Sequence, residues 1–338
     1  MLSLKHFLIL KLMNYEFDKY KCTTDSVKNK LEEYGVAIIP NLLNNEECDN
    51  MNDGVWNFFE HISQNWQTPF SPIKRKDKSS WNNIFHLNPI HSQLFKTYSI
   101  GHSQVLWDIR QNPKIVEPFA KIWNCDKEDL FVSFDALSFC LPPEITGVGW
   151  EKNNNSWFHT DQSYTRNNFE CVQSWITAND IDEGDATLSI MEGSHKYHEE
   201  FRDKYSVSNT NDWYLLNKEE EEFYSNKKCE YKRIKCPKGS LVLWDSRTIH
   251  HGTNPIKNRK NKNTRSIAYL CYMPKNKCNE LNYNRKIHAF NNLYTTTHWP
   301  CKIVCSLNEP NFNSGLNPGY TPIQPPRLTT LGESLVGL

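Results

Sequence analysis

The feature that most constrains this chain is a His-x-Asp triplet, His159-Thr160-Asp161, followed about ninety residues later by His250. Alternate residues of an extended segment point to the same side, so His159 and Asp161 can reach one ion while Thr160 faces away. Two imidazoles and one carboxylate can cap one face of an octahedral metal and leave the opposite face open. This arrangement is typical of non-haem Fe(II) sites that bind a co-substrate and O₂ side by side.

The triplet alone is a common pattern, and its context decides what it means. A His-x-Glu triplet, which offers the same ligand types, begins at His198, and such triplets are more often surface turns or hydrogen-bonded pairs than metal sites. The triplet at His159 lies in an aromatic segment and is followed by β-rich sequence, by His250 and by Arg265. On a late strand, the paired N–H donors of Arg265 are well placed to clamp a dicarboxylate such as 2-oxoglutarate. Arg259, in the preceding Lys/Asn-rich insertion, is the less favoured candidate.

Other histidines offer alternatives for the metal. His251 follows His250 directly, and neighbours on a strand point to opposite faces, so only one of the two can reach the ion. His195 and His198 lie three residues apart in a predicted helix, a spacing that also suits zinc. His298, in a Thr-His-Trp-Pro sequence, could approach the mouth of the site.

Hydrophobic periodicity predicts helices first and strands later. Helical spacing marks residues 44–61, which follow a cap at Asn44-Asn45, and also 113–123 and 279–292. Strands are expected over 171–181, 186–191, 241–244 and 265–272, with a β-like pattern over 130–141. This order predicts a mainly β fold, a sandwich or jelly roll with flanking helices that buttress one face. From Pro300 onward we expect an extended, Pro-rich wrap.

Length and charge limit the domain organisation and the partners. The 338 residues contain no Ser/Gly-rich or Pro-rich linker before the C-terminal tail, so we expect a single domain over 15–338 with a helical N-terminal part. The 39 Lys and Arg residues balance the 39 Asp and Glu residues. A zero net charge argues against long-range attraction to nucleic acid or to an anionic membrane. The locally basic stretch 257–265 is expected to be a solvated loop between two strands.

The N-terminus and the cysteines bear on the compartment. The apolar run 7–10 is too short to span a bilayer and lacks a small-residue cleavage site. We expect residues 1–14 to be a short apolar segment that need not be structured, with Met13 as an alternative start. The eleven cysteines are scattered, odd in number and without a Cys-x-x-Cys pair. Such usage is typical of reduced thiols, and we expect a soluble cytoplasmic protein.

Several segments together resemble the phytanoyl-CoA dioxygenase family of Fe(II)/2-oxoglutarate oxygenases, over most of the chain. The segments that carry the resemblance are 31–43 (LEEYGVAIIPNLL), 157–161 (WFHTD), 184–188 (GDATL), 193–196 (GSHK), 239–250 (GSLVLWDSRTIH) and Arg265. The resemblance implies a double-stranded β-helix, the cupin-like form of the jelly roll. Counted without a gap from Gly239, it places the third metal ligand at His250 and leaves His251 facing outward. It also leaves His195 and His198 outside the metal shell.

The resemblance further implies a site and a reaction. Fe(II) would be held by His159, Asp161 and His250, and the co-substrate 2-oxoglutarate would be clamped by Arg265. Trp175 would pack beside 2-oxoglutarate, and Thr253 would add a hydroxyl to the carboxylate clamp. Oxidative decarboxylation to succinate and CO₂ would accompany hydroxylation of a small-molecule substrate by O₂. Related halogenases lack the carboxylate ligand, so the presence of Asp161 favours hydroxylation.

Two alternatives from other classes stay open at the level of the sequence. One is a metal-binding β-barrel module without catalytic activity, although such a degenerate site would be expected to lose a ligand or Arg265. The other is a cupin-type enzyme that uses iron or manganese without 2-oxoglutarate and therefore does not need Arg265. No motif marks a pocket for coenzyme A, and the same fold and ligand set serve many substrates.

Overall fold

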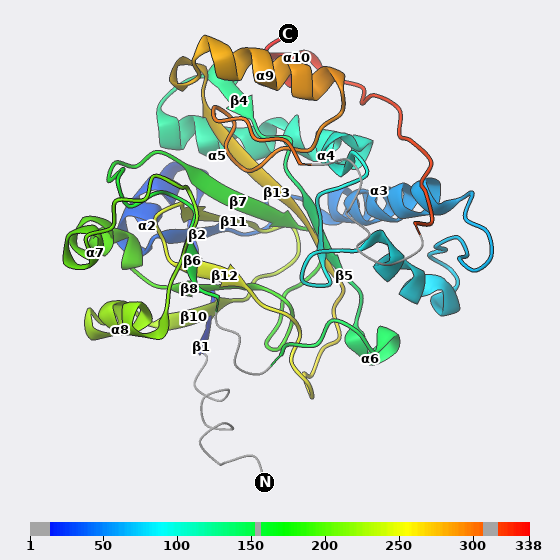
Figure 1. The fold of residues 1–338 in the computed structure, drawn as a ribbon, viewed down its shortest axis with the longest axis horizontal. Helices are drawn as coiled ribbons and strands as arrows, with labels where there is room; N and C mark the ends of the chain where they lie inside the picture. Colours follow the sequence, from blue (N-terminus) through cyan, green and yellow to red (C-terminus); the bar gives the residue numbers. More distant parts are fainter. Residues whose placement is uncertain (1–13, 153–156, 307–316) are drawn as a thin grey trace.

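Two stacked sheets form the centre of the protein (Figure 1), which is described by a computed structural model over residues 14–152, 157–306 and 317–338. The seven-stranded sheet has the order β2 (Val36–Ile39), β11 (Leu241–Asp245), β7 (Val172–Thr177), β13 (Arg265–Pro274), β5 (Leu137–Cys140) and β3 (Leu94–Phe95), with β4 (Leu130–Val132) paired to β13. The six-stranded sheet has the order β1 (Asn14–Glu16), β10 (Tyr231–Ile234), β8 (Leu188–Met191), β12 (His250–Gly252), β6 (His159–Thr160) and β9 (Tyr214–Leu215). Apart from the parallel pair β1–β10, the strand pairs are antiparallel. The predicted mainly β, double-stranded β-helix fold with flanking helices is confirmed.

Both faces of the larger sheet are buried, and each face packs against a different partner. Val242 and Trp244 of β11 join the core between the two sheets, whereas Leu241 and Leu243 join the core beneath the helices. Side chains alternate along a strand, so one apolar run supplies both cores. The inner core, between the sheets, also receives Trp175 of β7 and Ile190 of β8.

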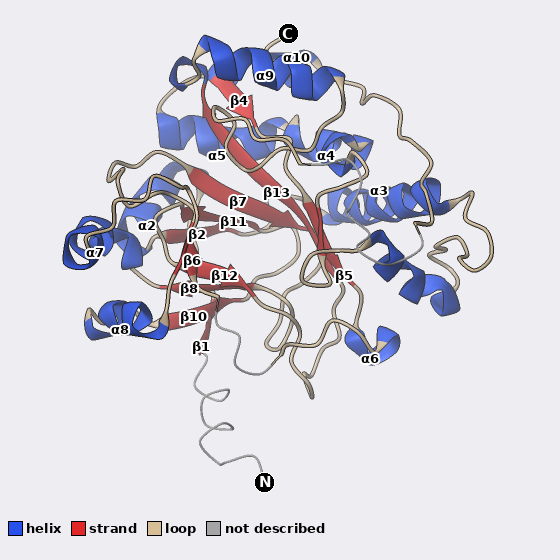
Figure 2. Cartoon of the chain, viewed as in Figure 1, coloured by secondary structure: helices blue, strands red, loops and turns tan. Residues whose placement is uncertain are grey.

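Helices cover the outer face of the larger sheet and the edges of the sandwich (Figure 2). Helices that contribute to the outer core include α2 (Val27–Tyr34), α3 (Asn45–Ser63), α4 (Gln104–Arg110) and α5 (Pro113–Trp123). Near β4 lie α9 (Glu280–Asn291) and α10 (Thr330–Val336). The remaining helices are α6 (Pro143–Thr146), α7 (His198–Tyr205) and α8 (Lys218–Asn226), and the last two share a separate aromatic cluster beside the smaller sheet.

Capping residues explain why three predicted helices are confirmed nearly to the residue. The Asn44 side chain accepts a hydrogen bond from the backbone N–H of Glu47, and the Glu47 carboxylate accepts one from the backbone N–H of Asn44, which completes a capping box at the start of α3. Asn112 caps α5, and Pro113 occupies its first position, where no backbone donor is needed. Asn279 caps α9 in the same way.

One local expectation is corrected, and two others are confirmed with added detail. The C-terminal wrap is not extended throughout, because Thr329 caps the helix α10 and its residues Leu335 and Val336 are buried. The β-like segment 130–141 forms two strands, β4 and β5, that pair with different parts of β13. The basic loop between β12 and β13 is mostly exposed as expected, but Arg259 within it is buried.

The chain ends and the predicted domain boundaries complete the fold. The predicted N-terminal apolar segment lies outside the described residues except for Asn14, which begins β1. The assignment of 15–338 to one domain stays a prediction. Within the described ranges, no helix combines the length and the apolar character needed to cross a bilayer.

Candidate metal centre

Strands β6 and β12 bring two of the predicted ligands together. His250 pairs with His159 across this antiparallel contact, and their imidazole ring centroids lie 4.4 Å apart. Asp161 follows β6, and its backbone N–H donates to the Ser246 carbonyl, between β11 and β12, at 3.2 Å. One possible ligand atom from each of His159, Asp161 and His250 lies within 4.8 Å of the others. The three side chains can therefore reach a single ion.

Backbone carbonyls orient both imidazoles. The Nδ1–H of His159 donates to the Trp157 carbonyl at 3.0 Å, and the Nδ1–H of His250 donates to the Thr248 carbonyl at 2.9 Å. The Nε2 atoms of these histidines lie 3.6 Å and 3.4 Å from Oδ2 of Asp161. A histidine that donates from Nδ1 keeps its lone pair on Nε2, so both rings present the atom that a metal would bind.

Gln173 of β7 holds the carboxylate from the opposite sheet. Its Nε2 donates to Oδ2 of Asp161 at 3.1 Å. Burial alone would raise the pKa of Asp161, but His159, His298 and His250 outweigh it and hold that pKa well below its usual range. Asp161 is therefore the anionic member of the group, as a metal carboxylate ligand must be.

The two adjacent histidines have different surroundings. Among the described residues, His250 belongs to the group of possible metal ligands and His251 does not. The ring of His251 instead meets Phe158 edge-on, with centroids 4.3 Å apart, and its Nδ1 lies 3.1 Å from the Gly252 carbonyl. Burial lowers the pKa of His250 and lowers that of His251 to about 3, so both rings are neutral near pH 7. Neutral imidazole is the form that binds metals.

Arg265 is a buried cation without an acidic partner in the described part of the chain. It opens β13, and its side chain lies between the sheets, where the guanidinium is 5.5 Å from the centre of the Trp175 ring. Its Nε donates to the Ser138 hydroxyl at 3.1 Å and its Nη1 to the Ala186 carbonyl at 2.9 Å. A buried guanidinium held only by neutral groups is suited to bind an anion.

Arg259, the less favoured sequence candidate, is already neutralised. Its guanidinium pairs with Glu144 at 2.8 Å and also binds Asp185. These two carboxylates tie the loop between β12 and β13 to α6 and to the segment before β8. We therefore assign Arg259 to the stability of the loop and not to ligand binding.

The remaining predicted residues take distinct positions. Trp175 is fully buried in the inner core beside Arg265, and its indole Nε1 has no hydrogen-bond partner among the described residues. The Thr253 hydroxyl donates to the Thr187 carbonyl at 3.2 Å, and its contribution to a carboxylate clamp stays a prediction. His195 and His198 lie outside the group of possible metal ligands and bond to backbone carbonyls through Nε2.

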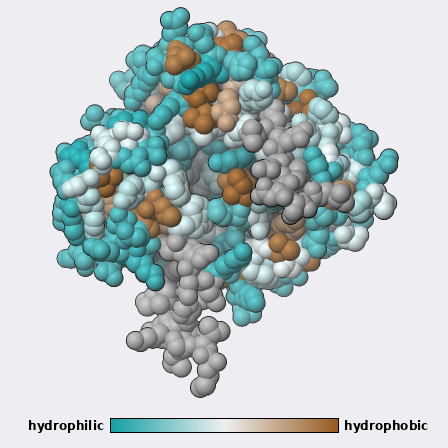
Figure 3. All heavy atoms as spheres, in the orientation of Figure 1, coloured by the Kyte–Doolittle hydropathy of each residue, from teal (hydrophilic) through white to brown (hydrophobic). Residues whose placement is uncertain are grey.

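Aromatic rings surround the ligand from β6. Trp157 stacks on His159 with centroids 4.9 Å apart and planes 11° apart, and His91 also stacks on Trp157, with centroids 4.8 Å apart. Trp213 approaches His159 at 5.9 Å. Figure 3 shows that the surface is hollowed near the middle of the face in view, with hydrophobic residues nearby.

Comparison with known proteins places this geometry in a family. The model of the phytanoyl-CoA dioxygenase (PhyH) family matches residues 31–263. A curated relative from Aspergillus versicolor, Ava biosynthesis cluster protein O, is 27% identical over 241 residues, which cover 69% of this chain and 74% of that protein. A putative phytanoyl-CoA dioxygenase from Dictyostelium discoideum is 23% identical over 295 residues, covering 75% of this chain and 77% of that protein.

A solved structure adds a likeness in fold. The crystal structure of GlcNAc Inducible Gene 2, GIG2 (DUF1479), from Candida albicans has a TM-score of 0.54 and 12% sequence identity. The likeness covers 85% of this chain and 73% of that one. At this identity it supports the arrangement of the two sheets and no particular activity.

Proposed function

Because this chain belongs to the phytanoyl-CoA dioxygenase family of Fe(II)/2-oxoglutarate-dependent oxygenases, we propose that it hydroxylates a small-molecule substrate with iron held by His159, Asp161 and His250. The observation that carries this proposal is that possible ligand atoms of the three side chains lie within 4.8 Å of one another. Arg265, which has no acidic partner among the described residues, lies in the same inner core. The family uses iron and 2-oxoglutarate together with a substrate and O₂.

The donor set fits a ferrous ion. Two neutral imidazoles and one carboxylate form a facial set that leaves the other coordination positions to the co-substrate and O₂. Both Nε2 atoms face the carboxylate of Asp161, and the Nδ1 atoms are tied to backbone carbonyls. Since β6 and β12 are hydrogen-bonded to each other, the two histidines are held on a rigid element rather than on separate loops.

Arg265 is the residue that would bind the distal carboxylate of 2-oxoglutarate. Its guanidinium is oriented by Ser138 and by the Ala186 carbonyl, and the flat face of Trp175 lies against it. These contacts fix the orientation of the paired N–H donors of the guanidinium before a ligand binds. A pre-oriented guanidinium loses little entropy on binding a carboxylate.

When bound, iron with 2-oxoglutarate and O₂ supplies the oxidising power for insertion of oxygen into a substrate C–H bond. The residues of the chain supply position and exclusion of water. His159 and His250 are buried, and the stacked rings of Trp157 and His91 shield one side of the site. The anionic ligand Asp161 occupies the position that a halide would need, which favours hydroxylation over halogenation.

Formation of succinate tests the proposal and separates it from its rivals. We expect the purified protein, supplied with Fe(II), 2-oxoglutarate and O₂, to release succinate, and we expect this release to increase with a true substrate in a screen of candidate metabolites. A cupin-type enzyme that does not use 2-oxoglutarate would oxidise substrate without forming succinate. A non-catalytic module would bind iron and release none. Either result would refute the proposed function.

A further inference from the structure

An exposed tryptophan lies directly beside the candidate metal ligand from β6. Trp213 is 51% exposed, although its ring centroid is only 5.9 Å from that of the buried His159. It immediately precedes β9, and Leu215 of that strand pairs with His159 and is itself 46% exposed. Single exposed apolar residues are ordinary, whereas neighbouring ones beside a buried polar site mark a binding surface more often. Trp213 therefore presents an apolar ring at the entrance to the site.

A second side chain comes from a segment of the C-terminal part of the chain that packs beside the loop after Asp161. The Nε2 atom of His298 is buried and has no hydrogen-bond partner among the described residues. The next residue, Trp299, lies under the guanidinium of Arg166 at 5.0 Å, so the segment that carries His298 packs against the loop that follows Asp161. A buried polar nitrogen without a partner is costly, and a bound ligand is one of the groups that can satisfy it.

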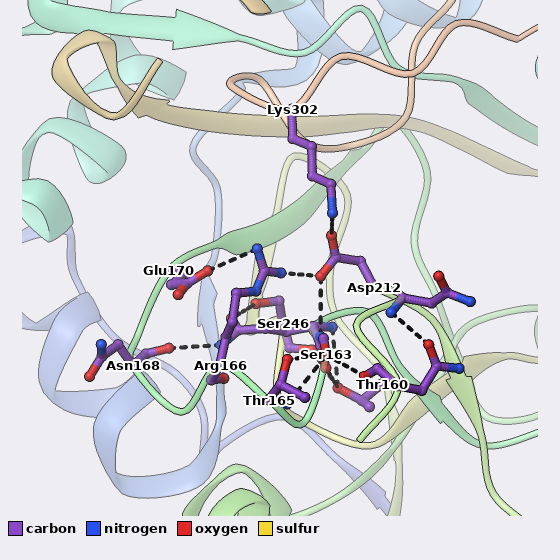
Figure 4. A network of polar contacts seen from close by, with 12 residues as sticks. Thr160, Ser163, Thr165, Arg166, Asn168, Glu170, Asp212, Ser246 and Lys302 are labelled. Atoms are coloured by element: carbon purple, nitrogen blue, oxygen red, sulfur yellow. Dashed lines mark hydrogen bonds and ion pairs between the residues drawn. The ribbon is translucent and has the colours of Figure 1, made fainter. Parts of the chain in front are cut away.

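Asp212 joins the segments that carry these two residues (Figure 4). Its carboxylate binds both Arg166, from the loop after the ligand Asp161, and Lys302, from the segment that contains His298. It also accepts the backbone N–H of Ser163 at 3.2 Å. Asp212, which directly precedes Trp213, is thus bound to both neighbouring segments. It is a positioning residue for Trp213 and for the segment that carries His298.

The charges of this network are balanced. Arg166 pairs with Glu170 at 3.3 Å as well as with Asp212, and Lys302 pairs with Asp212. Two cations therefore face two carboxylates, and neither cation is free to bind the phosphates of an anionic substrate. This balance favours a neutral molecule at this side of the site.

We propose that Trp213 and His298 form a substrate-binding wall for a neutral, ring-containing molecule that carries a hydroxyl or carbonyl group. The ring of the substrate packs on the indole of Trp213, and its oxygen forms a hydrogen bond with Nε2 of His298. The inference rests on the proposed function, because it places the substrate beside His159 and Asp161. His298 lies beyond residues 31–263, so this part of the wall comes from outside the segment that matches the family model.

The test uses 2-naphthol as a probe and naphthalene as its matched partner without the hydroxyl. Both are titrated by equilibrium dialysis against the full chain loaded anaerobically with Fe(II) and 2-oxoglutarate. The visible charge-transfer absorption of the loaded site reports separately whether iron and 2-oxoglutarate are bound. The variants are Trp213→Ala, Trp213→Phe and His298→Phe, with His288→Gln, an exposed histidine of α9, as the control.

The proposed contacts predict a different result for each variant. Trp213→Ala is expected to weaken 2-naphthol binding roughly tenfold, because an aromatic contact and its buried area are lost, whereas Trp213→Phe should retain most of the affinity. His298→Phe should bind 2-naphthol no more tightly than naphthalene, a loss of roughly threefold to tenfold for one hydrogen bond. The charge-transfer absorption should persist in each variant, and His288→Gln should match the parent.

Other outcomes would overturn the inference. Unchanged 2-naphthol affinity in Trp213→Ala, an equal preference for 2-naphthol over naphthalene in His298→Phe, or no binding of 2-naphthol by the loaded parent would each refute the wall. Absence of the charge-transfer absorption from the parent would instead contradict the proposed function. In that case the dialysis constants of the parent and the variants still decide whether Trp213 and His298 bind the probe.

Discussion

His159 and His250 are direct partners across the antiparallel pair β6–β12, with their imidazole centroids 4.4 Å apart. About ninety residues separate them in the chain, so their proximity depends on the closure of the smaller sheet. The carboxylate of Asp161 completes the group, and Gln173 of the larger sheet holds that carboxylate. The candidate site is therefore built where the two sheets face each other.

Removal of one member of this group should abolish iron binding. We expect His159→Ala and Asp161→Ala to lose most of their Fe(II), because the two remaining ligands cannot hold the facial geometry. Iron content after anaerobic loading and desalting, compared with the parent protein, measures the effect. Parent-like iron content in both variants would refute the assignment.

The adjacent histidines should behave differently from each other. His250→Ala should eliminate iron binding and activity, whereas His251→Ala should leave iron binding largely intact because that ring packs on Phe158. His251 is buried, so its variant is also expected to be less stable. Iron affinity must therefore be compared on the folded fraction, which circular dichroism monitors. The reverse pattern would assign the ligand to His251.

Loss of Arg265 should weaken 2-oxoglutarate binding selectively. A charge-assisted paired contact contributes about 1.5–3 kcal/mol, so Arg265→Ala should raise the required 2-oxoglutarate concentration roughly tenfold to hundredfold. Fe(II) affinity should change little, and Arg265→Lys should rescue only in part because it lacks the planar fork. Arg259→Lys serves as the control, with lower thermal stability and parent-like dependence on 2-oxoglutarate. The same concentration dependence in Arg265→Ala as in the parent would place the clamp elsewhere.

Gln173 should tune the metal site without binding the metal. Gln173→Leu keeps the approximate size of the side chain but removes the hydrogen bond to Asp161. Loss of such a supporting contact typically costs about tenfold to hundredfold in metal affinity. Ser174→Ala is the matched control, since the neighbouring side chain points to the opposite face of β7 and bonds to the Leu270 carbonyl. Equal iron dissociation constants for the two variants would contradict this role.

A buried lysine of α9 should make stability depend on pH. Lys286 is fully buried, donates to the Val132 carbonyl and lies over the ring of Phe134, and burial lowers its pKa from the ordinary 10.5 to about 7. Between pH 7 and about 10.5 the unfolded chain binds a proton that the folded chain lacks. The free energy of unfolding therefore receives a contribution that rises with pH across this range, and the cost of the buried charge is fully present below pH 7.

Comparison with Lys286→Met isolates this contribution, because the other titrating groups are common to both proteins. The melting temperature of the parent relative to the variant should rise between pH 7 and pH 10. Thermal denaturation followed by circular dichroism at a series of pH values provides the measurement. A difference that does not vary with pH would show that Lys286 titrates near its ordinary pKa when folded.

Local signals in the sequence determined many elements of the fold. Asn44, Asn112 and Asn279 cap helices because their side chains accept the free N–H groups of the first turn, and such a signal is readable without any neighbour in space. The apolar run 241–244 likewise predicted a strand, and the structure shows that this strand, β11, is buried on both faces. The His-x-Asp spacing identified two candidate ligands for the same reason.

Only the tertiary structure decided which distant groups meet. Gln173 carries no motif of its own; its place on β7, two residues before Trp175 on the same strand face, was the one available signal. Arg259 and Arg265 are the same residue type in one stretch of chain, yet one meets Glu144 and Asp185 and the other meets no carboxylate among the described residues. Periodicity describes which face a side chain occupies, whereas its partners depend on strand pairing between segments far apart in the sequence.

The same reason explains the surroundings of the site. Trp213 precedes β13 in the sequence and His298 follows it. Trp213 lies beside His159, and the segment of His298 packs against Arg166 in the loop after Asp161. The ion pairs of Asp212 with Arg166 and Lys302 connect these segments. Ion pairs between residues far apart in the chain produce no periodic pattern in a sequence. The ligand motif was therefore readable from the chain alone, but the wall beside it existed only once the sheets and loops had packed.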